Sequence, residues 1–325
     1  MIEFNKRNAR MWSIMGINPC IWSVGLEDVL SRNKEVAIFT ADLQRYSGLN
    51  RLFSQYPDLC YNMGIAEQNM VGAAAGMAME GVQTWMTTYA PFMSYRCADH
   101  FRHLMGNLNL NMKAIGSAAG FAAGLSGSSL LAVSDVAFAR SVPNVVVLSP
   151  ADCAEAIKMV LAVSEIESPV YMRFCGTTNI PMVYTEDYDF QIGKIHTVSE
   201  GERIAILATG NDMVYNAMKA ANKIEESRGF KPLVADVHTI KPFDKEYIND
   251  LAINYDAILT VEEHSVVGGL GSAVAECIAE NSLKVKFYTL GIEEKPYVMG
   301  KRPFMLSQAG LDVDGIINKI ESITL

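Results

Sequence analysis

Residues 62–76 read NMGIAEQNMVGAAAG and mark the point where a strand ends and a helix begins. Glu67 falls in the first turn of that helix, where the positive end of the helix dipole favours a carboxylate. The following residues are nearly all small, so the helix can pack tightly against a neighbour and bury Glu67. From the residues alone, a structural helix-start charge is the simpler interpretation. The alternative is a buried carboxyl group that shares a proton with a ring nitrogen.

Outward from this segment, short apolar runs alternate with helical patterns along nearly the whole chain. This alternation predicts an α/β fold of mainly parallel sheets with helices on both faces. The expected strands are 36–40, 59–63, 84–88, 112–116, 145–148, 170–174, 204–208, 233–237, 257–261 and 285–289. The expected helices are 27–31, 66–79, 91–105, 151–164, 213–228, 244–253, 271–280 and 313–320.

The chain is expected to form two domains, because its 325 residues exceed the usual length of one. The strand and helix pattern lapses from about residue 176 to residue 201, where Pro181 and an acidic cluster interrupt it. We therefore predict a first domain of residues 1–188 and a second of residues 189–325. We assign no role to residues 1–31.

The composition excludes several classes of protein. Hydrophobic residues make up 50% of the chain, which excludes wholesale disorder. The net charge is −9 with no basic patch, so no nucleic-acid partner is expected. The most apolar stretch, residues 114–139, is interrupted by Gly, Ser and Asp, so no membrane span is expected. No signal peptide is apparent, and the six scattered cysteines indicate reduced, mostly buried thiols in a cytoplasmic protein.

Two glycine-rich segments could bind phosphate, 268–274 (GGLGSAV) and 116–127 (GSAAGFAAGLSG). Val274 stands where a dinucleotide fingerprint needs glycine, so the first segment is better explained as a tight loop-to-helix turn. The second contains no Lys or Arg, and it predicts either a close approach of the backbone to another group or a mobile loop. No spacing of ligand side chains indicates a metal site in this chain.

Eight short segments, in order along the chain, carry a family resemblance: ADL (41–43), GIAEQ (64–68), TTYAPF (87–92), PNV (143–145), SPAD (149–152), HTIKPFD (238–244), EEH (262–264) and GGLGSAVAE (268–276). Together they resemble the pyrimidine-binding and C-terminal domains of thiamine-diphosphate enzymes of the transketolase superfamily. The resemblance is strongest with the separate C-terminal subunit of split transketolases. It extends to deoxyxylulose-phosphate synthase and to the beta subunit of 2-oxo acid dehydrogenases.

The resemblance implies roles for five residues near the cofactor. Glu67 matches the glutamate that hydrogen-bonds N1′ of the aminopyrimidine ring and drives its tautomerisation. Phe92 matches the aromatic residue that stacks on this ring, and Tyr95 matches a neighbouring aromatic residue. Gln68 belongs to the same motif as Glu67. Asp42 matches an acidic residue in the cofactor region, with a strand-end cap as the alternative interpretation.

The resemblance also implies a partner. Enzymes of this family hold the diphosphate and Mg²⁺ with a G-D-G motif, followed by asparagines, on a separate domain. This sequence contains no G-D-G. We therefore expect another polypeptide to carry that motif and bind Mg²⁺, with thiamine diphosphate at the interface. By analogy, two such chains and two partner chains would form a heterotetramer.

The segment after the expected strand 112–116 departs from the family pattern. Two histidines and an aspartate of ordinary transketolases, which contact substrate hydroxyls, are replaced here by Ala118, Leu130 and Ser126. Each polar substrate group left unpaired should weaken binding by roughly 1–3 kcal/mol. We therefore expect a more apolar pocket, suited to a less hydroxylated substrate such as a deoxy-sugar derivative or an acyl group from a 2-oxo acid.

Four residues are candidates for substrate binding. Arg173 matches an arginine that binds phosphate or carboxylate, although an exposed strand-end arginine is equally consistent. His100 and His103 are three residues apart on one helical face and could replace the lost histidines, but an interface pair is the simpler interpretation. Ser126 stands at a position that contacts substrate in the family. For His264, in the second domain, we expect a structural role.

The leading hypothesis is a subunit of a thiamine-diphosphate-dependent, transketolase-like transferase that is active only with its partner. It would move a short ketol or acyl unit from a donor to an aldehyde acceptor. The alternative is the beta subunit of a 2-oxo acid dehydrogenase or decarboxylase, which the histidine losses favour. Segments 238–240 and 262–264 resemble split transketolases more. A non-catalytic relative is the third hypothesis, and the presence of Glu67 and Phe92 argues against it.

Overall fold

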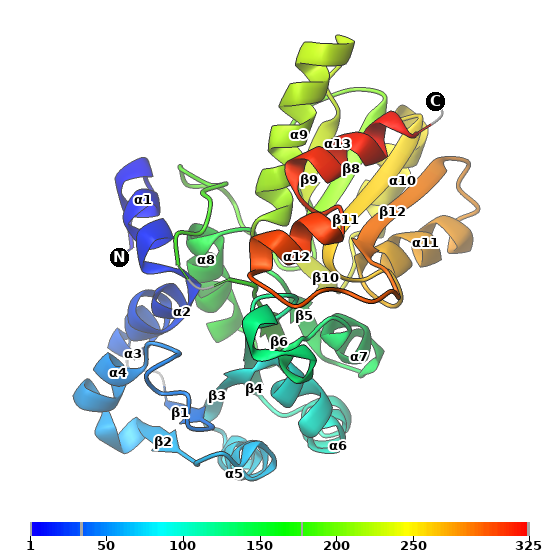
Figure 1. Cartoon of the computed structure of the whole chain (residues 1–325). Coiled ribbons are helices and arrows are strands. Elements are labelled where there is room, and N and C mark those ends of the chain that lie inside the picture. Colours follow the sequence, from blue (N-terminus) through cyan, green and yellow to red (C-terminus); the bar gives the residue numbers. More distant parts are fainter. Residues whose placement is uncertain (1, 33–34, 177, 324–325) are drawn as a thin grey trace.

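The computed structural model describes residues 2–32, 35–176 and 178–323. In this part of the chain two mostly parallel sheets are covered by helices, as predicted (Figure 1). The strands of the first sheet are β1 (Val36–Thr40), β2 (Cys60–Asn62), β3 (Gln83–Tyr89), β4 (Met112–Ser117), β5 (Val146–Leu148), β6 (Val170–Arg173) and β10 (Thr239–Lys241). They lie in the order β10-β5-β6-β4-β3-β1-β2, and all pairs are parallel except β10 with β5.

The second sheet lies C-terminal to most of the first. Its described strands are β7 (His196–Ser199), β8 (Ile204–Thr209), β9 (Leu233–Asp236), β11 (Ala257–Ser265) and β12 (Lys286–Ile292). They lie in the order β12-β11-β8-β9-β7, with only β7 antiparallel to its neighbour among these described strands. The sequence did not predict β7 and β10, which are short antiparallel edge strands. Strand β10 follows the predicted domain boundary in sequence but belongs to the first sheet. The boundary between residues 188 and 189 therefore stays a prediction.

Helices connect the strands and cover both sheets. Those before β4 are α1 (Lys6–Met15), α2 (Ile17–Pro19), η1 (Cys20–Leu26), α3 (Glu27–Ser31), α4 (Asn50–Gln55), η2 (Pro57–Leu59), α5 (Glu67–Met79), η3 (Phe92–Arg96), α6 (Ala98–His100) and η4 (Phe101–Asn107). Those after it are η5 (Gly124–Ser126), η6 (Ser128–Leu130), α7 (Asp135–Ser141), α8 (Cys153–Ser164), α9 (Met213–Arg228), α10 (Lys245–Asn254), α11 (Leu270–Glu280), α12 (Arg302–Gln308) and α13 (Val313–Glu321).

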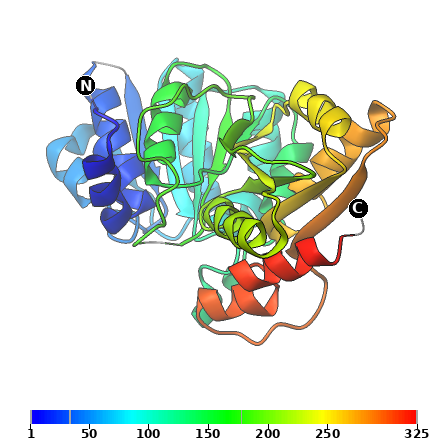
Figure 2. The same ribbon diagram turned by 90° about the horizontal axis from the view of Figure 1, so that it is seen from above.

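Successive side chains of a strand point to opposite faces of its sheet, so alternate residues pack against different helices. In β1, Val36 and Ile38 join a core with side chains of η1 and α8, whereas Ala37 and Phe39 face α5, η3 and η4. The second sheet packs against α9, α12 and α13 on one face and against α10 and α11 on the other (Figure 2). Every expected strand and helix has a counterpart, so the α/β prediction is confirmed.

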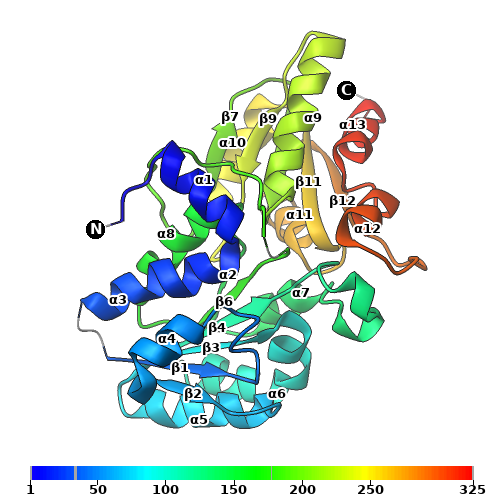
Figure 3. The same cartoon turned by 60° about the vertical axis from the view of Figure 1, so that its left-hand side comes forward.

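The N-terminal residues form a helical layer that the sequence predicted only at residues 27–31. Helices α1 and η1 lie beside α8, and α2 and α3 pack against η1; this layer is blue and α8 is green in Figures 1 and 3. Trp12 and Trp22 are buried in the same hydrophobic core as the apolar side chains of α8. This layer therefore closes the hydrophobic core on the outer side of α8.

The cysteines are free and all six are buried, as their scattered spacing indicated. Among the described residues, no helix has the length and apolar character needed to cross a bilayer.

Three buried carboxyl groups meet where α8 approaches the second sheet. Asp152 precedes α8, Glu155 lies in its first turn and Asp236 ends β9. Asp236 Oδ2 accepts a hydrogen bond from the Tyr184 hydroxyl at 2.9 Å, and Glu155 Oε1 accepts one from the Tyr188 hydroxyl at 2.5 Å. Burial raises the pKa of all three carboxyl groups, that of Asp236 to about 7.

We expect this cluster to make the fold less stable as the pH rises. A carboxyl group whose pKa is raised by folding contributes stability that is fully present below its ordinary pKa of 3.8 and is lost as the pH rises through about 7. Asp236→Asn cannot ionise, and its amide can donate to Glu155. Between about pH 5 and pH 8 this variant should gain about 2–3 kcal/mol in unfolding free energy relative to the wild type.

Urea unfolding of both proteins across that pH range measures the difference. Asp250→Asn removes an exposed carboxylate and is the matched control. A difference between wild type and Asp236→Asn that does not change with pH would contradict the prediction.

Candidate active site

Glu67 is the first residue of α5 and follows the turn after β2. Gly64 in that turn has a φ of 68°, a conformation that glycine adopts without strain. The side-chain oxygen of Asn62 accepts hydrogen bonds from the backbone N–H of Gly64 at 3.0 Å and of Asp42 at 3.2 Å. These bonds tie the end of β2 to the end of β1. Glu67 is only 3% exposed, so its expected burial is confirmed.

Arg96, which the sequence analysis did not single out, pairs with Glu67. Its Nη1 donates to Glu67 Oε1 at 2.9 Å and to Oε2 at 2.8 Å. The same guanidinium lies over the Phe92 ring, 3.9 Å from the ring centroid. The Arg96 carbonyl accepts a hydrogen bond from Gln68 Nε2 at 3.0 Å. The four-residue spacing of Phe92 and Arg96 on a helix is the sequence signal that could have identified Arg96.

The remaining predicted cofactor residues lie around this group. The strands β1, β2 and β3 are parallel neighbours, and Asp42, Glu67 and Phe92 each follow the C-terminal end of one of them. Ligands of parallel α/β sheets bind at this edge. The Tyr95 hydroxyl hydrogen-bonds Ser134 Oγ at 2.6 Å and accepts from the Ser134 backbone N–H at 3.0 Å. Tyr95 therefore links η3 to the start of α7.

Arg173 lies in the interior and is not an exposed strand-end residue. It is 1% exposed, and its Nε donates to Asp135 Oδ2 at 2.9 Å. Its Nη2 donates to the carbonyls of Ala132 at 3.3 Å and Glu263 at 3.2 Å. The Tyr171 hydroxyl donates to the same Asp135 oxygen at 2.7 Å. These contacts favour an interior structural role for Arg173 over direct contact with a substrate.

The other predicted substrate residues do not join the Glu67 group. His100 in α6 is half-buried, whereas His103 in η4 and Ser126 in η5 are exposed. Within the described ranges, none of the three shares a side-chain hydrogen bond or ion pair with Glu67 or Arg96. A role for them in substrate binding stays a prediction.

The glycine-rich turn before α11 is filled by a side chain of the protein itself. Glu262 Oε2 accepts from the Leu270 N–H at 2.7 Å, and Oε1 accepts from the Gly271 N–H at 2.7 Å. This carboxylate takes the place that a phosphate would need, which agrees with a loop-to-helix turn. Burial raises the pKa of Glu262 to about 7 and lowers that of His264 to about 4. His264 Nε2 accepts from the Ala137 N–H at 3.3 Å, the structural role we expected.

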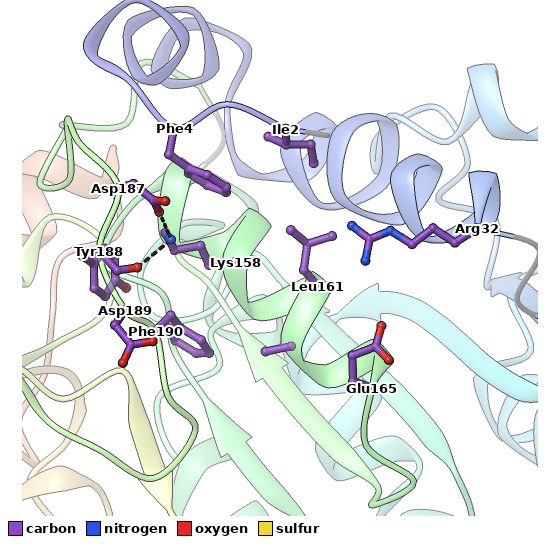
Figure 4. Close-up of a pocket in the computed structure, with 11 residues that line it drawn as sticks. Ile2, Phe4, Arg32, Lys158, Leu161, Glu165, Asp187, Tyr188, Asp189 and Phe190 are labelled. Carbon is purple, nitrogen blue, oxygen red and sulfur yellow. Dashed lines mark hydrogen bonds and ion pairs between the residues drawn. The ribbon is translucent and has the colours of Figure 1, made fainter.

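A groove of about 780 Å³ lies between the N-terminal layer and α8 (Figure 4). Lys158 lies over the Phe4 ring at 4.3 Å and forms an ion pair with Asp187. The residues that line the groove include none of the predicted site residues. The groove therefore adds nothing to the site around Glu67.

Comparison with known families agrees with this geometry. Residues 23–177 match the transketolase pyrimidine binding domain, and residues 193–316 match the transketolase C-terminal domain. The fold and the buried glutamate at the sheet edge thus define a protein that joins the pyrimidine-binding and C-terminal domains typical of thiamine-diphosphate enzymes. The chain belongs to the transketolase family, and its extent corresponds to the C-terminal section of split transketolases.

Three relatives illustrate this assignment. The chain is 34% identical over 288 residues to a transketolase C-terminal section from Methanocaldococcus jannaschii, covering 88% of this chain and 90% of that one. It is 31% identical over 299 residues to the 6-deoxy-6-sulfo-D-fructose transketolase subunit of a Clostridium species, covering 92% of each. A solved split-gene transketolase, described as an inactive beta4 tetramer, has a TM-score of 0.85 at 32% identity and covers 94% of this chain.

The residues around Glu67 fit the aromatic half of thiamine diphosphate. The guanidinium of Arg96 is a flat group with N–H donors, and it contacts both Glu67 oxygens while lying over Phe92. An aminopyrimidine ring is also flat and bears nitrogen, so it can make the same two kinds of contact. For the magnesium diphosphate, the described residues contain no group of three or more His, Cys, Asp or Glu side chains placed to hold a metal ion.

Proposed function

We propose that this chain supplies the aminopyrimidine-binding half of a thiamine-diphosphate site to a two-subunit, transketolase-like transferase. The observation that carries the proposal is the pairing of a buried Glu67 carboxylate with a flat N–H-bearing group that lies over Phe92. The enzyme would transfer a short ketol or acyl unit from a donor to an aldehyde acceptor. The relatives named above are transketolases, so we do not carry the 2-oxo acid dehydrogenase alternative further.

The residues of this chain would bind and activate the ring. Glu67 would hold a proton between its carboxyl group and N1′, and Phe92 would stack on the ring face. Arg96 would have to move away from Glu67, because its guanidinium occupies both carboxylate oxygens and the face of the Phe92 ring that the pyrimidine would need. The bound cofactor supplies the carbanion chemistry. Its diphosphate and Mg²⁺ would be held by the partner.

A partner subunit is part of the proposal. The sequence contains no G-D-G motif, and a single glutamate with an aromatic wall cannot neutralise a magnesium diphosphate. The solved relative described as an inactive tetramer of beta subunits supports dependence on a second kind of chain. We propose an assembly of two such chains with two diphosphate-binding subunits.

The substrate is proposed to carry fewer hydroxyl groups than an ordinary ketose phosphate. Ala118, Ser126 and Leu130 lie on one loop after β4, at positions where the resemblance places two histidines and an aspartate of ordinary transketolases. Ala118 is buried and has no group to pair with a substrate hydroxyl.

Reconstitution tests the proposed function. The chain is mixed with a diphosphate-binding transketolase subunit that carries a G-D-G motif, thiamine diphosphate and Mg²⁺. Ordinary ketose phosphates, deoxy-ketose analogues and pyruvate are then compared as donors with an aldehyde acceptor. We expect transfer only with both chains, and faster transfer from the deoxy donors. Full activity of this chain alone, or a reconstituted pair that binds no thiamine diphosphate, would refute the proposal.

A further inference from the structure

The second domain reaches into the glycine-rich loop that follows β4. Glu263 lies near the end of β11, is 1% exposed, and accepts a hydrogen bond from the Phe121 N–H at 2.7 Å. Gly120 has a φ of 60°, and a side chain at that position would collide with the Glu263 carboxylate. The sequence predicted either a close approach of this backbone to another group or a mobile loop. The structure shows the close approach, and the other group is the Glu263 carboxylate.

Arg302, the first residue of α12, holds Glu263 from the other side. Its Nε donates to both Glu263 oxygens at 3.1 Å, and its Nη2 donates to Oε2 at 2.5 Å. Its Nη1 donates to Asp212 Oδ2 at 2.5 Å. Burying a carboxylate costs free energy unless it is paired, so Arg302 stabilises Glu263 in the position where it accepts the hydrogen bond of the loop amide.

Helix α12 and the segment before it make a second contact with the same loop. A side chain at Gly124 would collide with Met305 and with the Gly300 carbonyl. The Phe121 and Tyr297 rings pack with their centroids 5.3 Å apart. The loop is therefore held at two places by residues of the second domain.

We propose that Glu263 and Arg302 are positioning residues that fix the loop carrying Ala118, Ser126 and Leu130, and through it the fit of the donor substrate. This inference rests on the proposed function, because the resemblance assigns those three positions to substrate contact. Glu67 and Phe92 follow other strands, β2 and β3. Loss of the anchor should therefore weaken donor binding while cofactor binding is kept.

Arg302→Met tests the anchor, and Arg140→Met is the matched control. Arg140 also connects the two halves of the chain, donating to the Gly268 carbonyl and the Glu276 carboxylate, each at 2.7 Å, but it does not touch the loop. Hydrogen exchange of the Phe121 amide in the full chain should speed up about 10-fold or more in Arg302→Met and stay nearly unchanged in Arg140→Met. In Glu263→Gln, which keeps an acceptor oxygen, the exchange rate of the Phe121 amide should rise less. This milder variant still tests the anchor if Arg302→Met does not fold.

The reconstituted enzyme provides the second readout. In Arg302→Met the KM of the donor should rise about 10-fold while kcat and the cofactor dissociation constant stay within about 2-fold, and Arg302→Lys should restore part of the loss. Equal effects of Arg302→Met and Arg140→Met on exchange, or an equal loss of cofactor affinity and donor binding, would overturn the inference. If wild-type pairs show no transfer at all, the proposed function fails, whereas the exchange experiment still decides whether the anchor exists.

Discussion

Glu67→Gln is expected to lower the turnover of the reconstituted enzyme by about 10²–10⁴-fold, the usual contribution of a positioned acid–base group. The amide keeps the size of the side chain and can still hydrogen-bond, but it cannot share a proton with a ring nitrogen. Because Glu67 is buried beside Phe92 and Arg96, bulk water cannot readily replace it as a proton donor. Steady-state transfer from the best donor, at saturating thiamine diphosphate, measures the loss.

Glu80→Gln is the control for this variant. Glu80 lies at the other end of α5 and is exposed. Its change to Gln replaces the same carboxylate by the same amide, but away from the candidate site. It should leave turnover unchanged. Thermal unfolding of both variants shows whether the fold is kept. Turnover of Glu67→Gln at the wild-type rate would contradict the role assigned to this carboxyl group.

Arg173→Met is expected to destabilise the protein by about 3–5 kcal/mol, because it leaves a buried carboxylate without its counter-charge. The side chains of Arg173 and Asp135 are only 2% and 0% exposed. Asp135 Oδ1 is also buried without a hydrogen-bond partner in the described structure, so without Arg173 the carboxylate keeps only the neutral Tyr171 hydroxyl as a donor. Denaturant unfolding at neutral pH measures the change in unfolding free energy.

Two further variants make this prediction specific. Arg102→Met breaks an exposed pair with Asp99, and we expect no measurable change in stability. Asp135→Asn combined with Arg173→Met removes the orphaned charge, so the double variant should be more stable than Arg173→Met alone. A loss of activity in Arg173→Met without a loss of stability would instead support substrate binding by Arg173.

Most of the fold follows from local patterns. The strand predicted at residues 36–40 and the helix predicted at residues 213–228 have the bounds of β1 and α9. Buried parallel strands are continuous apolar runs, and amphipathic helices repeat at a fixed spacing, so both are visible in sequence. The strands β7 and β10 were missed because they are short and lie at sheet edges. Their pairing depends on contacts with distant segments, Asp236 with His196 and Leu148 with Thr239.

The candidate site divides in the same way. Glu67 and Phe92 could be identified because each lies in a short motif with a family resemblance, and the burial of Glu67 followed from the small residues after it. The ion pairs of the structure could not be identified from the sequence. Asp135 and Arg173 are 38 residues apart in sequence, and Glu263 and Arg302 are 39 residues apart. A charged residue in a sequence does not show which partner the fold will bring to it.

The sequence by itself determined the α/β architecture, the place of Glu67 at the start of a helix, and the absence of a G-D-G motif, because these depend on residue order over short distances. Only the tertiary structure decided that Arg96 lies on Glu67 and Phe92, that Arg173 is an interior ion pair, and that the second domain holds the loop at Gly120. Each of these depends on the packing of elements remote in sequence. Side-chain reach and desolvation, rather than local pattern, then select the partner of each charge.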